Sequence, residues 1–297
     1  MLMGMLSGFA AALINCAGYL FSAGFLLRYK SPVRLLVISS VVMMLVSIPF
    51  VWWLFPFDMV PDIWSYLGQI LLTSTLFLLG QGAFFGSMRY FEASRVSSLL
   101  GLKIVVLSLI FILSGGVLNW MQIAAVLLAA MIFNWSGSGK SSIQGWLLLL
   151  VTLCCYSCVD MLETGLVVKV HEYTQWHKLR SAVAVVPMIY GVLGLIVSPA
   201  WLWMRPSVGE VQKAWPYALL WLGSQVLLLC CFAFLQPVFG NVILATRGIF
   251  SVLIGMLLPG LGLAALDSTI PASMWIRRAV AALVMLAAIG VYSFGSL

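Results

Sequence analysis

Long apolar stretches alternate with short polar connections along the whole chain. Each stretch holds about 20 residues, which as an α-helix matches the thickness of the hydrocarbon core of a bilayer. The stretches are too long and too uniformly apolar for the strands or amphipathic helices of a water-soluble core. We therefore predict ten membrane-spanning helices. They cover residues 3–27, 35–54, 67–87, 96–114, 118–135, 146–168, 181–203, 215–236, 240–258 and 275–294.

The short connections hold nearly all of the charged residues. Examples are RYKSPVR at 28–34, HEYTQWHKLR at 171–180 and MRPSVGEVQKAW at 204–215. Tryptophans gather near the ends of the apolar stretches, as at Trp52 and Trp203. Tryptophan prefers the boundary between lipid and water, so this pattern supports the predicted span ends.

Composition gives the same class of protein. Hydrophobic residues make up 63% of the chain, charged residues 8%, and the mean hydropathy is +1.13. Soluble domains carry about 25% charged residues, so lipid must be the main solvent here. The net charge of +7 fits basic loops beside anionic headgroups. We expect a multi-pass protein of the plasma (inner) membrane that contacts the lipid bilayer and no nucleic acid.

The two halves of the chain resemble each other. A shift of 144 residues places Gln81 on Gln225 and Lys103 on Arg247, and a shift of 141 places SAGFLLR on ETGLVVK. The sequence therefore predicts two five-helix repeats, at 1–136 and 145–297, joined by a linker at 137–144. Because five is odd, the second repeat is inverted in the membrane. Inverted repeats are typical of secondary transporters, whose substrate sites lie near the membrane midplane.

One family combines these features. The chain has the small-residue turn EASRVSSLL at 92–100 before a short fourth span, and a further apolar helix after Gly115 and Gly116. In this respect it resembles the drug/metabolite transporter superfamily, EamA-like branch. The resemblance implies two inverted five-helix EamA-like repeats and the export or uptake of small metabolites.

Charges inside spans are costly and mark candidate functional residues. We predict that four polar residues bind substrate, with an acidic pair as candidates for proton or ion coupling. Lysine and arginine suit an anionic or zwitterionic ligand, because both donate hydrogen bonds to carboxylates and phosphates. An alternative is that Asp160 simply neutralises Arg247. The substrate set is Gln81, Lys103, Gln225 and Arg247, and the coupling set is Asp160 and Glu163.

No recognisable catalytic, metal or cofactor motif accompanies these residues. GSGKSS at 137–142 lacks the first glycine of a phosphate-binding loop, and His171 and His177 lie six apart rather than four. We therefore predict no enzymatic activity and no cofactor. The expected function is a secondary transporter that moves a small polar metabolite by alternating access. The alternative hypothesis is a membrane-embedded enzyme or accessory subunit without transport activity.

The orientation in the membrane can be tested directly. We number the connections between spans in chain order, so that all odd-numbered connections lie on one side of the membrane. Ten basic residues lie in or beside the odd-numbered connections, and three (Lys169, Lys178 and Arg180) lie on the opposite side. The positive-inside rule then places both termini outside, whereas the family resemblance implies termini in the cytoplasm. We follow the charge bias, because it uses this chain's own residues. A reporter fused after Leu297 that is active only in the cytoplasm should be inactive, and an active fusion would refute this orientation.

Overall fold

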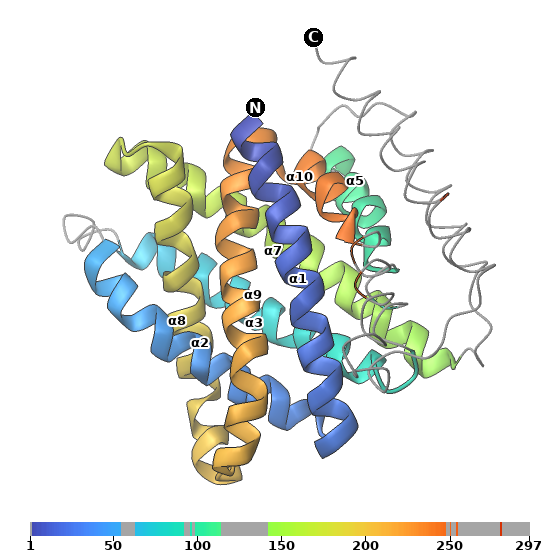
Figure 1. Ribbon diagram of the computed structural model, residues 1–297. Coiled ribbons are helices and arrows are strands. Elements are labelled where there is room, and N and C mark those ends of the chain that lie inside the picture. The colour runs from blue at the N-terminus through green and yellow to red at the C-terminus, as the bar shows by residue number, and fades with distance from the viewer. Residues whose placement is uncertain are drawn as a thin grey trace.

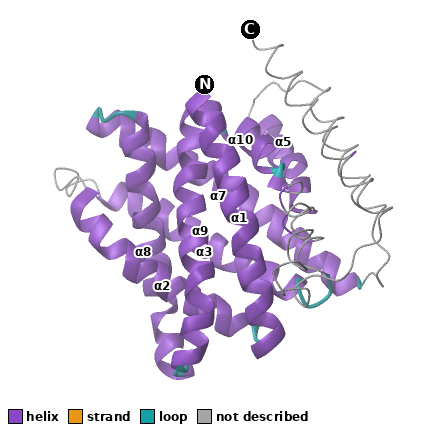
Figure 2. Ribbon diagram, viewed as in Figure 1, coloured by secondary structure: helices purple, strands orange, loops and turns teal. Residues whose placement is uncertain are grey.

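The described part of the molecule is a bundle of helices joined by short loops (Figures 1 and 2). The computed structural model describes residues 2–54, 63–91, 99–113 and 142–247, and residues 96, 250, 254 and 280. Within these ranges there are helices and no strands. The helices are α1 (Leu2–Tyr29), α2 (Pro32–Leu54), α3 (Ile63–Ser87), η2 (Leu100–Leu102), α5 (Lys103–Leu113), α7 (Ile143–Thr174), α8 (Lys178–Met204), α9 (Val208–Leu235) and α10 (Pro237–Leu244).

Six of these helices, α1, α2, α3, α7, α8 and α9, are long and apolar enough to cross a membrane. They match six of the predicted spans. The described part of the span at 96–114 contains α5, and α10 begins three residues before the predicted span at 240–258 and overlaps its first five residues. These observations are consistent with a multi-pass helical membrane protein. The spans predicted at 118–135 and 275–294 lie outside the described residues.

The connections predicted at 171–180 and 204–215 are shorter in the structure. Helix α7 extends to Thr174, and α9 begins at Val208, so only 175–177 and 205–207 remain as loops. The start of α9 is stabilised by a capping box, in which the Ser207 side chain accepts from the Glu210 backbone N–H and the Glu210 side chain accepts from the Ser207 backbone N–H. A hydropathy pattern misses this extension, because the first turn of the helix is polar.

The long helices pack in three principal pairs. Helix α1 lies along α9, α2 along α8, and α3 along α7. Figure 1 shows α1 and α9 side by side in the middle of the bundle. The two short helices complete this arrangement, because α5 packs on α7 while α10 packs on α1. Each principal pair therefore joins a helix from before residue 114 to one from after residue 142.

An ion pair ties two helix starts together at one end of the bundle. Arg34, in the first turn of α2, donates to the Glu210 carboxylate at 2.5 Å. At the same end, the guanidinium of Arg89 donates to the backbone oxygen of Lys30 at 2.8 Å. Arg34 and Arg89, from two of the predicted connections or their flanks, thus lie at one end of the bundle together with Glu210 from a third.

Helices α2 and α8 approach most closely at Gly194. A Cβ atom added to Gly194 would lie 2.2 Å from Met44 Cβ and 2.9 Å from the backbone oxygen of Ser40. Both distances are far below van der Waals contact. Small residues permit such close approach between membrane helices, where packing and hydrogen bonding hold the helices together.

We expect Gly194→Ala to lower the free energy of unfolding by about 1–3 kcal/mol, the usual range for overpacking. Gly223→Ala is the matched control, because nothing lies within 4 Å of its added Cβ. Thermal unfolding of the purified protein in one detergent would measure both. Equal unfolding temperatures for the two variants would contradict the close contact between α2 and α8.

Candidate functional site

A buried ion pair lies where three helices meet. Lys103 Nζ, in the first turn of α5, is 2.7 Å from Asp160 Oδ2 on α7, and each side chain is only 6% exposed. The Asn241 side-chain amide on α10 donates to the same carboxylate oxygen. The helix dipole disfavours a cation at the start of α5, so the Asp160 carboxylate compensates both the lysine charge and this helix end.

The ion pair differs from the alternative that the sequence suggests, in which Asp160 neutralises Arg247. In the structure the carboxylate forms its ion pair with Lys103. Sequence spacing sets the depth of a residue in the membrane, but the rotation of each helix about its axis decides which side chains meet.

Arg247 contacts an aromatic side chain on another helix. Its guanidinium donates a long hydrogen bond of 3.4 Å to the Tyr19 hydroxyl on α1 and lies 6.0 Å from the centre of that ring. Arg247 is buried, as predicted, and the Tyr19 ring beside it is connected through Trp221 to Tyr156, the ring beside Lys103. The structure therefore brings the two predicted cations into one buried region.

Glu163 is the most deeply buried acid of the region. It lies three residues after Asp160, and both acids face inward from α7, as the sequence spacing predicts. The residue is 1% exposed, and its Oε2 has no hydrogen-bond partner among the described residues. Burying an ionised carboxylate without full hydrogen bonding is costly. The site therefore favours a proton or a ligand on Glu163.

Gln81 connects three helices through its side-chain amide. Its nitrogen donates to the Tyr217 hydroxyl on α9, and its oxygen accepts from the Tyr156 hydroxyl on α7. Gln225 is also buried, one helical turn after Trp221, but the hydrogen bonds of Gln81 run to the two tyrosines. The side chains of Gln81 and Gln225 are thus both buried, as predicted, but the hydrogen-bond partners of Gln81 are tyrosines and not Gln225.

Six aromatic side chains contact one another in the centre, and two of them bind Gln81. They come from α1, α3, α7, α8 and α9, and all are buried. We call them the central aromatic cluster. Its members are Tyr19, Phe77, Tyr156, Tyr190, Tyr217 and Trp221. Neither this cluster nor Asn241 was predicted from the sequence. A usable signal was present, because Tyr19, Tyr156 and Tyr190 lie well inside predicted apolar spans rather than at their ends, where interfacial tyrosine is expected.

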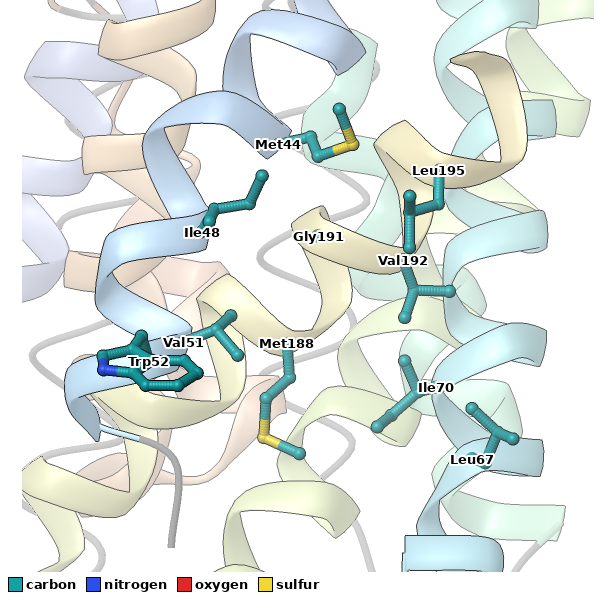
Figure 3. A pocket seen from close by; sticks show the side chains of 10 residues that line it. All are labelled: Met44, Ile48, Val51, Trp52, Leu67, Ile70, Met188, Gly191, Val192 and Leu195. Carbon is teal, nitrogen blue, oxygen red and sulfur yellow. The ribbon is translucent and has the colours of Figure 1, made fainter. Parts of the chain in front are cut away.

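A separate cavity opens on the side of the bundle (Figure 3). It has a volume of about 480 Å³ and lies between α2, α3 and α8. Its lining is apolar, with Met44 and Met188 on its walls and Trp52 at its edge. Trp52 is 75% exposed, so the cavity faces outward. None of the predicted site residues lines it, and its surface offers no recognition of a polar substrate.

Among the described residues, no group of three or more metal-ligand side chains forms. Cys154 is exposed, and Cys155 and Cys158 are partly exposed on α7, away from the buried charges. His177 caps the start of α8 by accepting a hydrogen bond from the Leu179 N–H at 3.4 Å.

Comparisons with known proteins establish the fold and nothing more specific. No protein-family model matches the chain, and no curated protein matches it. In structure, 26 chains match. One crystal structure among them aligns with a TM-score of 0.66 over 97% of this chain and 96% of its own, at 14% sequence identity. At this identity the likeness concerns the fold alone, and it extends over nearly the whole length of both chains.

We expect Asp160→Asn to destabilise the protein by about 3–5 kcal/mol, because it leaves the buried Lys103 cation without its carboxylate. The double variant Lys103→Met with Asp160→Asn should recover most of the loss. Thermal unfolding in detergent would measure both. Arg34→Gln is the control, because Arg34 is 41% exposed and such pairs contribute about 1 kcal/mol or less. An Asp160→Asn variant as stable as the parent would contradict the ion pair.

Proposed function

We propose that this protein is a secondary transporter that moves a small anionic or zwitterionic metabolite by alternating access. Two buried cations, each presented by a short helix to a long one, carry the proposal. Lys103 on α5 meets Asp160 on α7, and Arg247 after α10 meets Tyr19 on α1. The 144-residue shift aligns the cations, and the 141-residue shift also aligns Tyr19 with Asp160. Equivalent contacts at equivalent positions support a repeat.

The helix packing agrees with the same symmetry. Under the proposed inverted repeat, α1 exchanges with α7, α2 with α8, α3 with α9, and α5 with α10. The pair α1–α9 then becomes α7–α3, and α5–α7 becomes α10–α1, all of which are packed pairs in the bundle. The pair α2–α8 exchanges with itself. This pattern supports two repeats whose interface runs through the centre, where transporters place their substrate.

The chemistry of the centre favours a substrate that carries an acidic group. Lys103 and Arg247 are charge-assisted donors, and Gln81 adds an amide on α3. In this proposal Asp160 holds Lys103 until substrate arrives. Glu163, whose Oε2 lacks a hydrogen-bond partner among the described residues, carries a coupling proton or ion. We place the protein in the drug/metabolite transporter superfamily, EamA-like branch, and in the plasma (inner) membrane.

The competing hypothesis is a membrane-embedded enzyme or accessory subunit without transport activity. Counterflow in proteoliposomes separates the two, because only a carrier exchanges unlabelled internal substrate for labelled external substrate. We expect the full chain to support saturable counterflow of at least one member of a panel of labelled amino acids and small organic acids. Failure of the whole panel would count against a transporter of this substrate class.

We expect Arg247→Gln to reduce that counterflow about 30-fold or more, as for the loss of a buried charge that holds a ligand, which costs about 2–5 kcal/mol. Arg34→Gln, a cation at the end of the bundle, is the matched control and should transport normally. Counterflow by Arg247→Gln equal to that of Arg34→Gln would refute direct binding by Arg247.

A further inference from the structure

The central aromatic cluster has a hub at Trp221. The Trp221 ring lies 6.1 Å from Tyr19, 5.8 Å from Phe77, 6.1 Å from Tyr156 and 5.8 Å from Tyr217, measured between ring centres. Rings at these separations attract one another beyond simple burial of apolar area. The hub therefore joins rings from α1, α3, α7 and α9, which are the four helices of two principal packed pairs.

The polar atoms of the cluster turn inward, toward one another. The Trp221 indole N–H donates to the Tyr190 hydroxyl at 3.0 Å, and Gln81 bridges the hydroxyls of Tyr156 and Tyr217. Lipid would not satisfy these groups, so the network is suited to a closed interior. Opening that interior in the course of transport would leave ring faces and hydroxyls without partners unless a ligand replaced them.

Both buried cations touch the edge of this cluster. Lys103 Nζ lies 5.9 Å from the centre of the Tyr156 ring, and the Arg247 guanidinium lies 6.0 Å from that of Tyr19. The cluster thus combines stacking faces with donors for an acidic group. Aromatic cages alone often bind quaternary ammonium ions. Here the adjacent cations oppose a positively charged ligand.

We propose that the transported metabolite carries a planar conjugated ring together with its acidic group. The ring stacks among Tyr156, Trp221 and Phe77, while the acidic group reaches Lys103 or Arg247. This inference rests on the proposed transport function and specifies its substrate class. A saturated ring of similar size has no π face, so it gains burial but not the ring–ring attraction.

Matched pairs of probes test the proposal in counterflow with the full chain. Benzoate is compared with cyclohexanecarboxylate, and phenylalanine with cyclohexylalanine, so that charge and size stay nearly constant. Phenyltrimethylammonium serves as the cationic probe. Each unlabelled probe competes with a labelled substrate from the panel. We expect the aromatic member of at least one pair to inhibit counterflow at about a tenfold lower concentration than its saturated partner. The cationic probe should not compete.

Substitution of the hub gives a second test. Trp221→Leu should reduce the preference for the aromatic probe about tenfold while leaving competition by its saturated partner unchanged, and Trp221→Phe should keep most of the preference. Trp146→Leu is the matched control, because Trp146 packs on Phe91 at 5.6 Å, outside the cluster. If Trp221→Leu does not fold, Phe77→Leu tests the same site, because it removes another ring beside Tyr156 and Trp221. It should lower the preference for the aromatic probe and leave competition by its saturated partner unchanged.

The outcomes separate this inference from the proposed function. Counterflow of aliphatic acids or amino acids with no preference for the aromatic probes would overturn the ring proposal and leave the transporter intact. Competition by phenyltrimethylammonium stronger than by benzoate would also overturn it. Loss of aromatic preference in Trp146→Leu to the same extent as in Trp221→Leu would show a general packing effect and refute the assigned site. Absence of counterflow for every probe would overturn both proposals.

Discussion

A charge inside a bundle of apolar helices must find a partner, and this constraint organises the centre of the molecule. Lys103 and Asp160 meet at 2.7 Å with almost no exposure to the surroundings. Neither charge is tolerable alone at this depth. Their pairing holds the short helix α5 against α7, and Asn241 joins α10 to the same carboxylate. A single carboxylate thereby links two short helices to a long one.

The same constraint explains why polar and aromatic groups gather together. Tyrosine and tryptophan combine a large apolar ring with one polar atom, so they can fill a buried space and also satisfy an amide such as Gln81. Around the centre of the bundle, the helix faces toward lipid carry leucine, isoleucine and valine, such as Leu45 and Leu195.

The helices before residue 114 contact those after residue 142 through different kinds of interaction in the centre and at the end of the bundle. In the centre they are buried hydrogen bonds, ring contacts and one ion pair. At one end they include the partly exposed pair of Arg34 and Glu210. Between α2 and α8, close packing at Gly194 replaces polar contacts. The proposed alternating access would require the central ion pair and hydrogen bonds to exchange partners.

The sequence by itself determined the helical membrane class and the approximate position of each described span. Lipid admits only internally bonded backbone, so about 20 apolar residues in a row can be little else than a helix. It also identified Lys103, Asp160, Glu163 and Arg247, because a charge within an apolar run is visible without coordinates. Only the tertiary structure decided that Asp160 pairs with Lys103, that Asn241 joins them, and that Trp221 is the hub of an aromatic cluster. The physical reason is that these contacts depend on the rotation and crossing of helices distant in sequence, and apolar lipid leaves no periodic polar face from which that rotation can be predicted.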